Sequence, residues 1–271
     1  MADRNAAFVG DIPSNYDRYL GPAFFHGFAD DLAGRIQVTP GVRVLETACG
    51  TGIVTRRLAD RLRGHGSIVA TDLNEAMIAH GSAQMPTGTG HVEWQPADAT
   101  KLPFPDASFD AVVCQFGLMF FPDKATGIRE AFRVLKPGGH YLFNVWDAMA
   151  KNPMARIAHE SVARFFPVDP PSFYMVPFSL HDPEPILKLL AEAGFGQVEV
   201  THLEKQGTSP SAADAATGLI EGNPILAAIM ERRPEALDDI KRATAAAVAA
   251  ELGDRPVRVP LHAIVFSARR P

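Results

Sequence analysis

The sequence is poor in the features that mark secreted, membrane-spanning and nucleic-acid-binding proteins. Its 271 residues include two cysteines, Cys49 and Cys114, which exclude a disulfide framework and favour a reducing compartment. No stretch approaches the roughly 18 apolar residues of a membrane span, and charges stand where a signal peptide has its apolar core. The formal net charge is −5, with no basic run to bind nucleic acid or an anionic membrane. We therefore expect a cytoplasmic protein.

What the chain does contain is typical of a folded globular protein. Hydrophobic residues make up 46% and charged residues 21%, which excludes a disordered chain. The length allows one or two domains with a sizeable core, so neither disulfides nor a structural metal are needed. Nine histidines are scattered without metal-ligand spacing, and we expect no bound metal.

Short β-branched runs alternate with helical patterns between residues 40 and 146. The predicted strands are 42–45, 67–70, 91–94, 111–114 and 141–145. Apolar residues four apart over 54–62 predict a helix, and a similar stripe over 128–135 predicts another, which Pro137-Gly138-Gly139 ends. Strands that alternate with helices form a parallel sheet covered on both faces. We predict an α/β, Rossmann-like, doubly wound and mostly parallel sheet of seven strands.

The flanking segments supply helices and the last two strands. Residues 148–180 are aromatic and rich in proline, and we interpret them as irregular. Asp182 and Pro183 begin a helix that Gly194 ends. Strands are predicted at 198–201 and 259–266, where Pro260 indicates an edge strand or a strand start. The predicted divisions are a helical cap (1–39), a cofactor-binding core (40–146), a lid or substrate segment (147–195) and two strands with a helical insertion (196–271, insertion about 207–253).

Acidic and small residues follow consecutive predicted strands, where ligands of open α/β sheets bind. Glu46 precedes the glycines Gly50 and Gly52, and Asp72 and Asp98 end the next two strands. The dinucleotide pattern GxGxxG fails, because its third glycine would fall on Thr55. A carboxylate at position 46 would repel a pyrophosphate but suits a ligand with an ammonium and a sulfonium, as S-adenosylmethionine (SAM) has. An NAD(P)-dependent oxidoreductase stays as an alternative, since Asp72 suits both cofactors.

Three segments resemble the class I SAM-dependent methyltransferases, ubiquinone/menaquinone-biosynthesis-like (type 11) branch. Residues 44–52 (VLETACGTG) resemble their motif I, residues 97–110 (ADATKLPFPDASFD) their acidic-loop stretch, and residues 133–139 (RVLKPGG) the signature before the fifth strand. Residues 116–123 (FGLMFFPD) lack the paired histidines that quinone methyltransferases of this branch often carry. The missing histidines remove candidate bases and leave an apolar wall.

The resemblance implies a SAM-dependent methyltransferase that acts on a small, partly apolar molecule and releases S-adenosylhomocysteine (SAH). Asp72 is implied to bind the ribose hydroxyls, Asp98 the adenine amino group, and Glu46 the methionine part. The implied cofactor-binding residues are Tyr16, Glu46, Ala48, Cys49, Gly50, Asp72, Leu73, Met77, Asp98, Ala99, Gln115 and Phe116. The sequence assigns neither a catalytic base nor an oligomeric state. A catalytically silent SAM-binding module is a further alternative.

Overall fold

The computed structural model describes residues 8 and 10–271, so residues 1–7 and 9 of the predicted cap lie outside the described part. The strands are β1 (Val42–Thr47), β2 (Gly66–Asp72), β3 (His91–Pro96), β4 (Phe109–Gln115), β5 (Leu135–Trp146), β6 (Gly196–Ser209) and β7 (Val257–Arg269). They form one sheet in the order β3-β2-β1-β4-β5-β7-β6. All neighbours from β3 to β5 are parallel, whereas β7 runs antiparallel to both β5 and β6. This confirms the Rossmann-like, seven-stranded fold.

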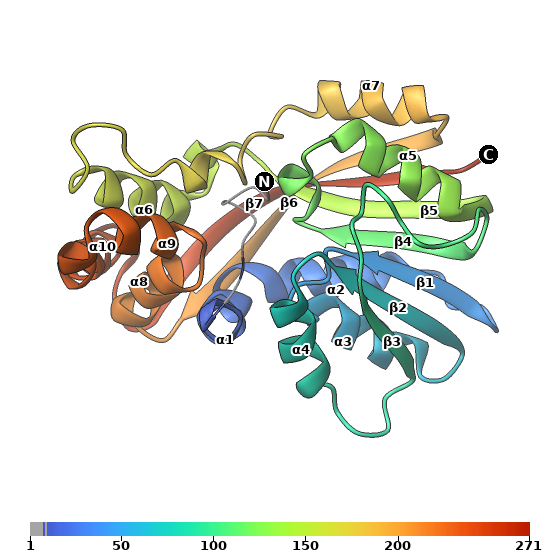
Figure 1. Ribbon diagram of the computed structural model, residues 1–271, viewed down its shortest axis with the longest axis horizontal. Coiled ribbons are helices and arrows are strands. Elements are labelled where there is room, and N and C mark those ends of the chain that lie inside the picture. The colour runs from blue at the N-terminus through green and yellow to red at the C-terminus, as the bar shows by residue number, and fades with distance from the viewer. Residues whose placement is uncertain (1–7, 9) are drawn as a thin grey trace.

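Helices cover both faces of the sheet. They are α1 (Ile12–Asn15), a π-helix (Tyr16–Phe25), α2 (His26–Arg35), α3 (Ile53–Leu62), α4 (Glu75–Ala83), α5 (Lys124–Val134), α6 (Pro153–Ala163), α7 (Pro183–Ala193), α8 (Ala212–Glu221), α9 (Ile225–Arg232) and α10 (Leu237–Leu252). Figure 1 shows α5 and α7 together on one side of the sheet, with α2 and α3 packed together on the other. The helices therefore give the sheet the two-sided cover that buried parallel strands require.

Apolar stripes and local caps explain where these helices form. In α3 the predicted stripe of Val54, Leu58 and Leu62 is fully buried. At α7 the carboxylate of Asp182 accepts a hydrogen bond from the N–H of Glu184, and the helix ends at Gly194 with a φ of 98°. Both helices agree with the sequence-based expectation.

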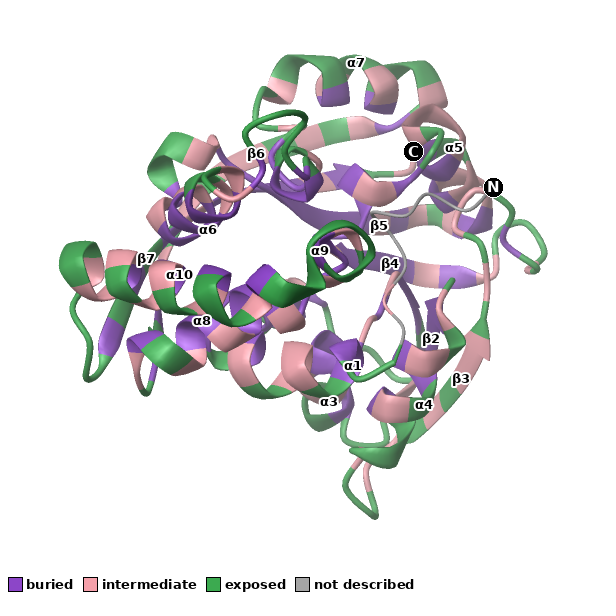
Figure 2. Ribbon diagram, turned by 60° about the vertical axis from the view of Figure 1, so that its left-hand side comes forward, coloured by how far each residue is buried: buried purple, intermediate pink, exposed green. Residues whose placement is uncertain are grey.

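The last two strands, β6 and β7, extend beyond the end of the neighbouring strand β5. The pairing of β5 with β7 ends at Trp146 and Ala263, so residues 257–262 of β7 pair with β6 alone. Helices α6, α8, α9 and α10 gather around this two-stranded extension (Figure 1). Their outer turns are exposed, while the central strands are largely buried (Figure 2). The predicted helical insertion is thus the cover of an extended β-ribbon.

Three local predictions were wrong or incomplete. Pro137-Gly138-Gly139 does not end the helix, because α5 ends at Val134 and these three residues already belong to β5. The irregular segment 148–180 contains α6, which Pro153 begins as a first-turn proline. The strand with Pro260 is not an edge strand, although Pro260 itself lies where β5 no longer pairs with it. Its missing N–H therefore costs no ladder hydrogen bond on that side.

Candidate functional site

A pocket of about 730 Å³ lies at the carboxyl ends of β1, β2, β3 and β4, and we call it the polar pocket. Ten of the twelve predicted cofactor-binding residues line it: Tyr16, Ala48, Gly50, Asp72, Leu73, Met77, Asp98, Ala99, Gln115 and Phe116. The parallel order of the strands brings these residues together from segments up to 100 positions apart. The structure thus has a pocket at the edge of the sheet where the sequence predicts a ligand site.

The backbone around the polar pocket has unusual conformations. Gly50 and Gly52 have φ values of 55° and 77°, and a Cβ on Gly52 would stand 2.5 Å from a ring atom of Trp94. Ala48 and Phe116 also have positive φ values, both 51°, although neither is glycine. Such conformations cost about 1 kcal/mol or more each and are common at ligand sites. The loops after β1 and β4 are therefore held in shapes that a free chain would avoid.

Asp72 is the central polar group of this pocket. Its carboxylate accepts hydrogen bonds from the N–H of Gly50 at 2.9 Å and from the backbone and side-chain amide groups of Asn74 at 2.8 and 3.2 Å. The residue is 7% exposed, and burial raises the pKa of its carboxyl group against the effect of these hydrogen bonds. The bonds fix the carboxylate between β2 and the glycine loop, where it can accept further hydroxyl hydrogens.

Glu46 and Cys49 do not line the pocket, in contrast to the other ten predicted residues. Glu46 is 1% exposed, and its carboxylate accepts a hydrogen bond of 2.6 Å from the hydroxyl of Thr55. Burial raises the pKa of Glu46 to about 8. Cys49 is likewise buried. Glu46 thus joins the end of β1 to the first turn of α3 from inside the fold.

The other walls of the polar pocket carry groups that a ligand could contact. The Oε1 atom of Gln115 is buried and accepts no hydrogen bond from the residues that the structure describes. Leu73 is 60% exposed although its side chain is apolar. Asp98 is exposed, and its carboxylate accepts hydrogen bonds from the N–H and the hydroxyl of Thr100. A ligand with an apolar face and several hydrogen-bond donors would satisfy these groups.

The π-helix places Tyr16 over the pocket, and Asp17 ties it to the glycine loop. The carboxylate of Asp17 accepts hydrogen bonds from the hydroxyl of Thr51 at 2.8 Å and from the guanidinium of Arg56 at 2.9 Å. Tyr16 is half-buried and stacks on Phe25 at 4.7 Å between ring centroids. The N-terminal segment is therefore part of the site.

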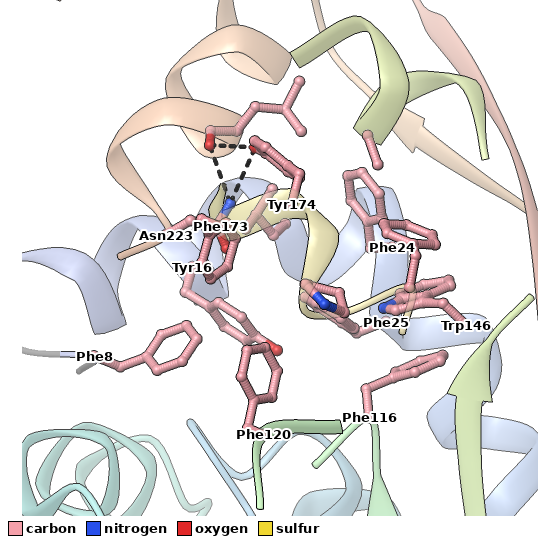
Figure 3. A pocket seen from close by; sticks show the side chains of 15 residues that line it. Phe8, Tyr16, Phe24, Phe25, Phe116, Phe120, Trp146, Phe173, Tyr174 and Asn223 are labelled. Carbon is pink, nitrogen blue, oxygen red and sulfur yellow. Dashed lines mark hydrogen bonds between the residues drawn. The ribbon is translucent and has the colours of Figure 1, made fainter. Parts of the chain in front are cut away.

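A second pocket of about 530 Å³, which we call the aromatic pocket, adjoins the first (Figure 3). Ten aromatic side chains line it: Phe8, Tyr16, Phe24, Phe25, Phe116, Phe120, Trp146, Phe173, Tyr174 and Phe178. Leu20, Ala155, Pro177, Leu219 and Asn223 complete the lining, so none of the described lining residues carries a charge. This pocket suits an uncharged, largely apolar molecule.

The two pockets share a wall. Phe8, Tyr16, Phe116 and Phe120 line both of them, and Phe116 stacks on Trp146 with ring centroids 3.8 Å apart. The sequence pointed to Tyr16 and Phe116 and placed Phe120 in the apolar wall of residues 116–123, but it did not identify Phe8 or the end of α8 as parts of a site. For the end of α8 the only signal was the length of the insertion after β6. Two ligands can thus meet across this aromatic wall.

The described residues contain neither a cluster of metal ligands nor a helix that could span a membrane. Within residues 8 and 10–271, no group of three or more His, Cys, Asp or Glu side chains could hold a metal ion. Among the described helices, none has the length and apolar character needed to cross a membrane.

Comparisons with known proteins match these features. A family model described as a methyltransferase domain matches residues 44–139. The ubiquinone/menaquinone biosynthesis C-methyltransferase UbiE of Proteus mirabilis is 32% identical over 173 residues, which cover 59% of this chain and 69% of that protein. The UbiE protein of Ectopseudomonas mendocina is 33% identical over 183 residues, covering 63% of this chain and 70% of that protein.

Solved structures share the fold at lower identity. The phosphoethanolamine N-methyltransferase 2 of Haemonchus contortus, solved in complex with S-adenosyl-L-methionine, has a TM-score of 0.62 and 17% identity, with 100% of this chain and 60% of that chain covered. At this identity the likeness concerns the fold alone.

Proposed function

Because this chain belongs to the UbiE-like family of SAM-dependent methyltransferases, we propose that its polar pocket binds SAM and its aromatic pocket an apolar methyl acceptor. The enzyme transfers a methyl group from SAM to a small molecule and releases SAH. A catalytically silent module and an NAD(P)-dependent oxidoreductase are not favoured by the family. The division of the chain at 39/40, 146/147 and 195/196 and a cytoplasmic location stay predictions.

The groups of the polar pocket fit the parts of SAM. Asp72 would accept the ribose hydroxyls, since its carboxylate is already oriented by Gly50 and Asn74. Leu73 would cover one face of the adenine, which explains why an apolar side chain is exposed there. The buried, unpaired Oε1 of Gln115 offers an acceptor for a donor group of the cofactor. Asp98, Ala99, Ala48 and Met77 would complete this binding surface.

Glu46 and Cys49 would act on the cofactor from behind the glycine loop. The carboxylate of Glu46 lies close enough to Asp72 for their charges to interact. Burial keeps its carboxyl group largely protonated near neutral pH, and a cation bound in the polar pocket would favour the ionised form without a direct contact. Cys49 would contribute through the backbone of the loop.

The chain's own task in the reaction is to align the acceptor and exclude water. SAM supplies a methyl group that its sulfonium already activates. The shared wall of Tyr16, Phe116 and Phe120 would hold an acceptor atom beside the polar pocket and keep solvent out. No charged side chain lines the described part of the aromatic pocket, which supports an uncharged acceptor.

The proposal rests mainly on one observation, the wall that the polar pocket and the aromatic pocket share. Calorimetry tests whether the two pockets bind the cofactor and an acceptor analogue. We expect SAM and SAH to bind the folded protein with dissociation constants in the micromolar range. The acceptor analogue 1-naphthol should bind the SAH complex without displacing SAH. Failure of SAH to bind folded protein at millimolar concentration would refute the assignment of the polar pocket.

A further inference from the structure

A polar cluster closes the end of the aromatic pocket that lies away from the polar pocket. Tyr174, from the short helix Phe173–Met175, donates its hydroxyl hydrogen to the carbonyl oxygen of Leu219 at 2.6 Å. Asn223, just after α8, donates from its side-chain nitrogen to the same carbonyl at 3.1 Å and to the Tyr174 hydroxyl at 3.5 Å. In Figure 3 the dashed lines mark these hydrogen bonds, and Tyr174 and Asn223 are labelled. Neither Tyr174 nor Asn223 lines the polar pocket.

The cluster fixes the orientation of the Asn223 amide. The carbonyl oxygen of Leu219 is an acceptor only, so the Asn223 atom that contacts it must be the NH₂ group. Both amide hydrogens are directed to Leu219 and Tyr174. No described residue donates a hydrogen bond to the Oδ1 atom of Asn223, and the atom is not fully enclosed, so water can reach it in the empty pocket. Asn223 as a whole is 8% exposed, and an apolar ligand that filled the pocket would cut Oδ1 off from water at a cost of about 1–3 kcal/mol unless the ligand supplies a donor.

On this basis, and resting on the proposed function, we infer that Asn223 is a specificity-determining residue for the methyl acceptor. Its Oδ1 accepts a hydrogen bond from a hydroxyl or N–H group of the acceptor, at the end opposite to the atom that is methylated. The enzyme's substrate class is then a neutral aromatic molecule with a hydrogen-bond donor at this far end. Molecules with a carbonyl or ether there are disfavoured, because Oδ1 would face a second acceptor.

The test compares two probes of equal shape on the protein saturated with SAH. The probes are 1-naphthol and 1-methylnaphthalene, which differ by a hydroxyl in place of a methyl group. Equilibrium dialysis gives the two dissociation constants. We expect 1-naphthol to bind the wild-type protein at least as tightly, although its apolar surface is smaller. In Asn223→Leu the ratio of the two constants should shift by about tenfold toward 1-methylnaphthalene.

Gln206→Leu is the matched control, because it also replaces an amide side chain by leucine, at an exposed position of β6 that lines neither pocket. It should keep the wild-type preference. SAH binding is measured separately for each variant, so loss of SAH binding refutes the proposed function and not the role of Asn223. The inference is overturned if wild-type protein prefers 1-methylnaphthalene, if neither probe binds, or if Asn223→Leu retains the wild-type ratio. The comparison of the probes on wild-type protein tests it even if Asn223→Leu does not fold.

Discussion

Replacing Glu46 by Gln should change how the stability of the protein depends on pH. Glu46 is 1% exposed, and burial raises the pKa of its carboxyl group from 4.5 to about 8. Between these values the folded protein holds a proton that the unfolded chain has released. The free energy of unfolding therefore falls as the pH rises from 4.5 to about 8, and this contribution is fully lost above that range. Gln is similar in shape to Glu but does not ionise, so the stability of the variant should not fall in this way as the pH rises.

The size of the effect follows from the two pKa values. They differ by about 3.5, which corresponds to about 5 kcal/mol at 1.36 kcal/mol for each pKa unit. The group is fully buried, so solvent does not screen the cost. The hydrogen bond from Thr55 favours the ionised form and so offsets part of the rise in pKa that burial causes. We expect the variant to gain about 3–5 kcal/mol relative to wild type between pH 4.5 and about 8.

Urea unfolding at several pH values measures this gain, without cofactor. Glu93→Gln is the control, because Glu93 is an exposed carboxylate on β3. Its stability should stay parallel to that of wild type throughout. If the curves of Glu46→Gln and wild type also run parallel between pH 4.5 and 8, the argument for a desolvated carboxyl group is wrong. If Glu46→Gln is more stable than wild type but binds SAM more weakly, the carboxyl group of Glu46 favours SAM binding at the expense of the stability of the free protein.

Three further predictions concern the cofactor, the N-terminal segment and a close backbone contact. Asp72→Ala should weaken SAH binding by about 1–3 kcal/mol, measured by calorimetry, because hydroxyl donors lose a charged acceptor. Asp17→Asn should lower the free energy of urea unfolding by about 1 kcal/mol, because its half-exposed ion pair with α3 is lost. Gly207→Ala should lower it by about 1–3 kcal/mol, since the new Cβ would stand 1.9 Å from the carbonyl oxygen of Ala23. Gly34→Ala is its control, because a Cβ there meets nothing within 4 Å.

The sequence predicted the parts of the fold that local patterns determine. Alternating strands and helices set the parallel order, and this order alone brings Asp72 and Asp98 to one edge of the sheet. The stop at Gly194 was predictable because a left-handed residue after an apolar stripe favours glycine. Helix α6 was missed although its apolar stripe was present, because the surrounding prolines and aromatic residues suggested a loop.

Other features of the site depend on contacts between distant segments. The sequence predicted that Glu46 binds the cofactor, but it held no signal for the burial of Glu46 beneath the loop or its bond to Thr55. The positive φ values of Ala48 and Phe116 were equally unpredictable, since neither residue favours them. At Phe116 the conformation is held by hydrogen bonds from its N–H to the side chain and backbone of Asn144 on β5. Tertiary structure has overcome local preference there.

The two pockets are built mainly from different parts of the chain, so cofactor binding and the choice of acceptor depend largely on different residues. The polar pocket is built mainly from residues 44–139, the segment that the methyltransferase family model matches. Much of the aromatic pocket comes from segments outside it, including Trp146, and its far end is formed by Tyr174 and Asn223. Substitutions there can change the acceptor without disturbing the cofactor. Phe116 lines both pockets and stacks on Trp146, so under the proposed function its backbone conformation would set the distance between the two ligands. The acceptor can therefore vary only as far as this shared wall still holds its reacting atom beside the cofactor.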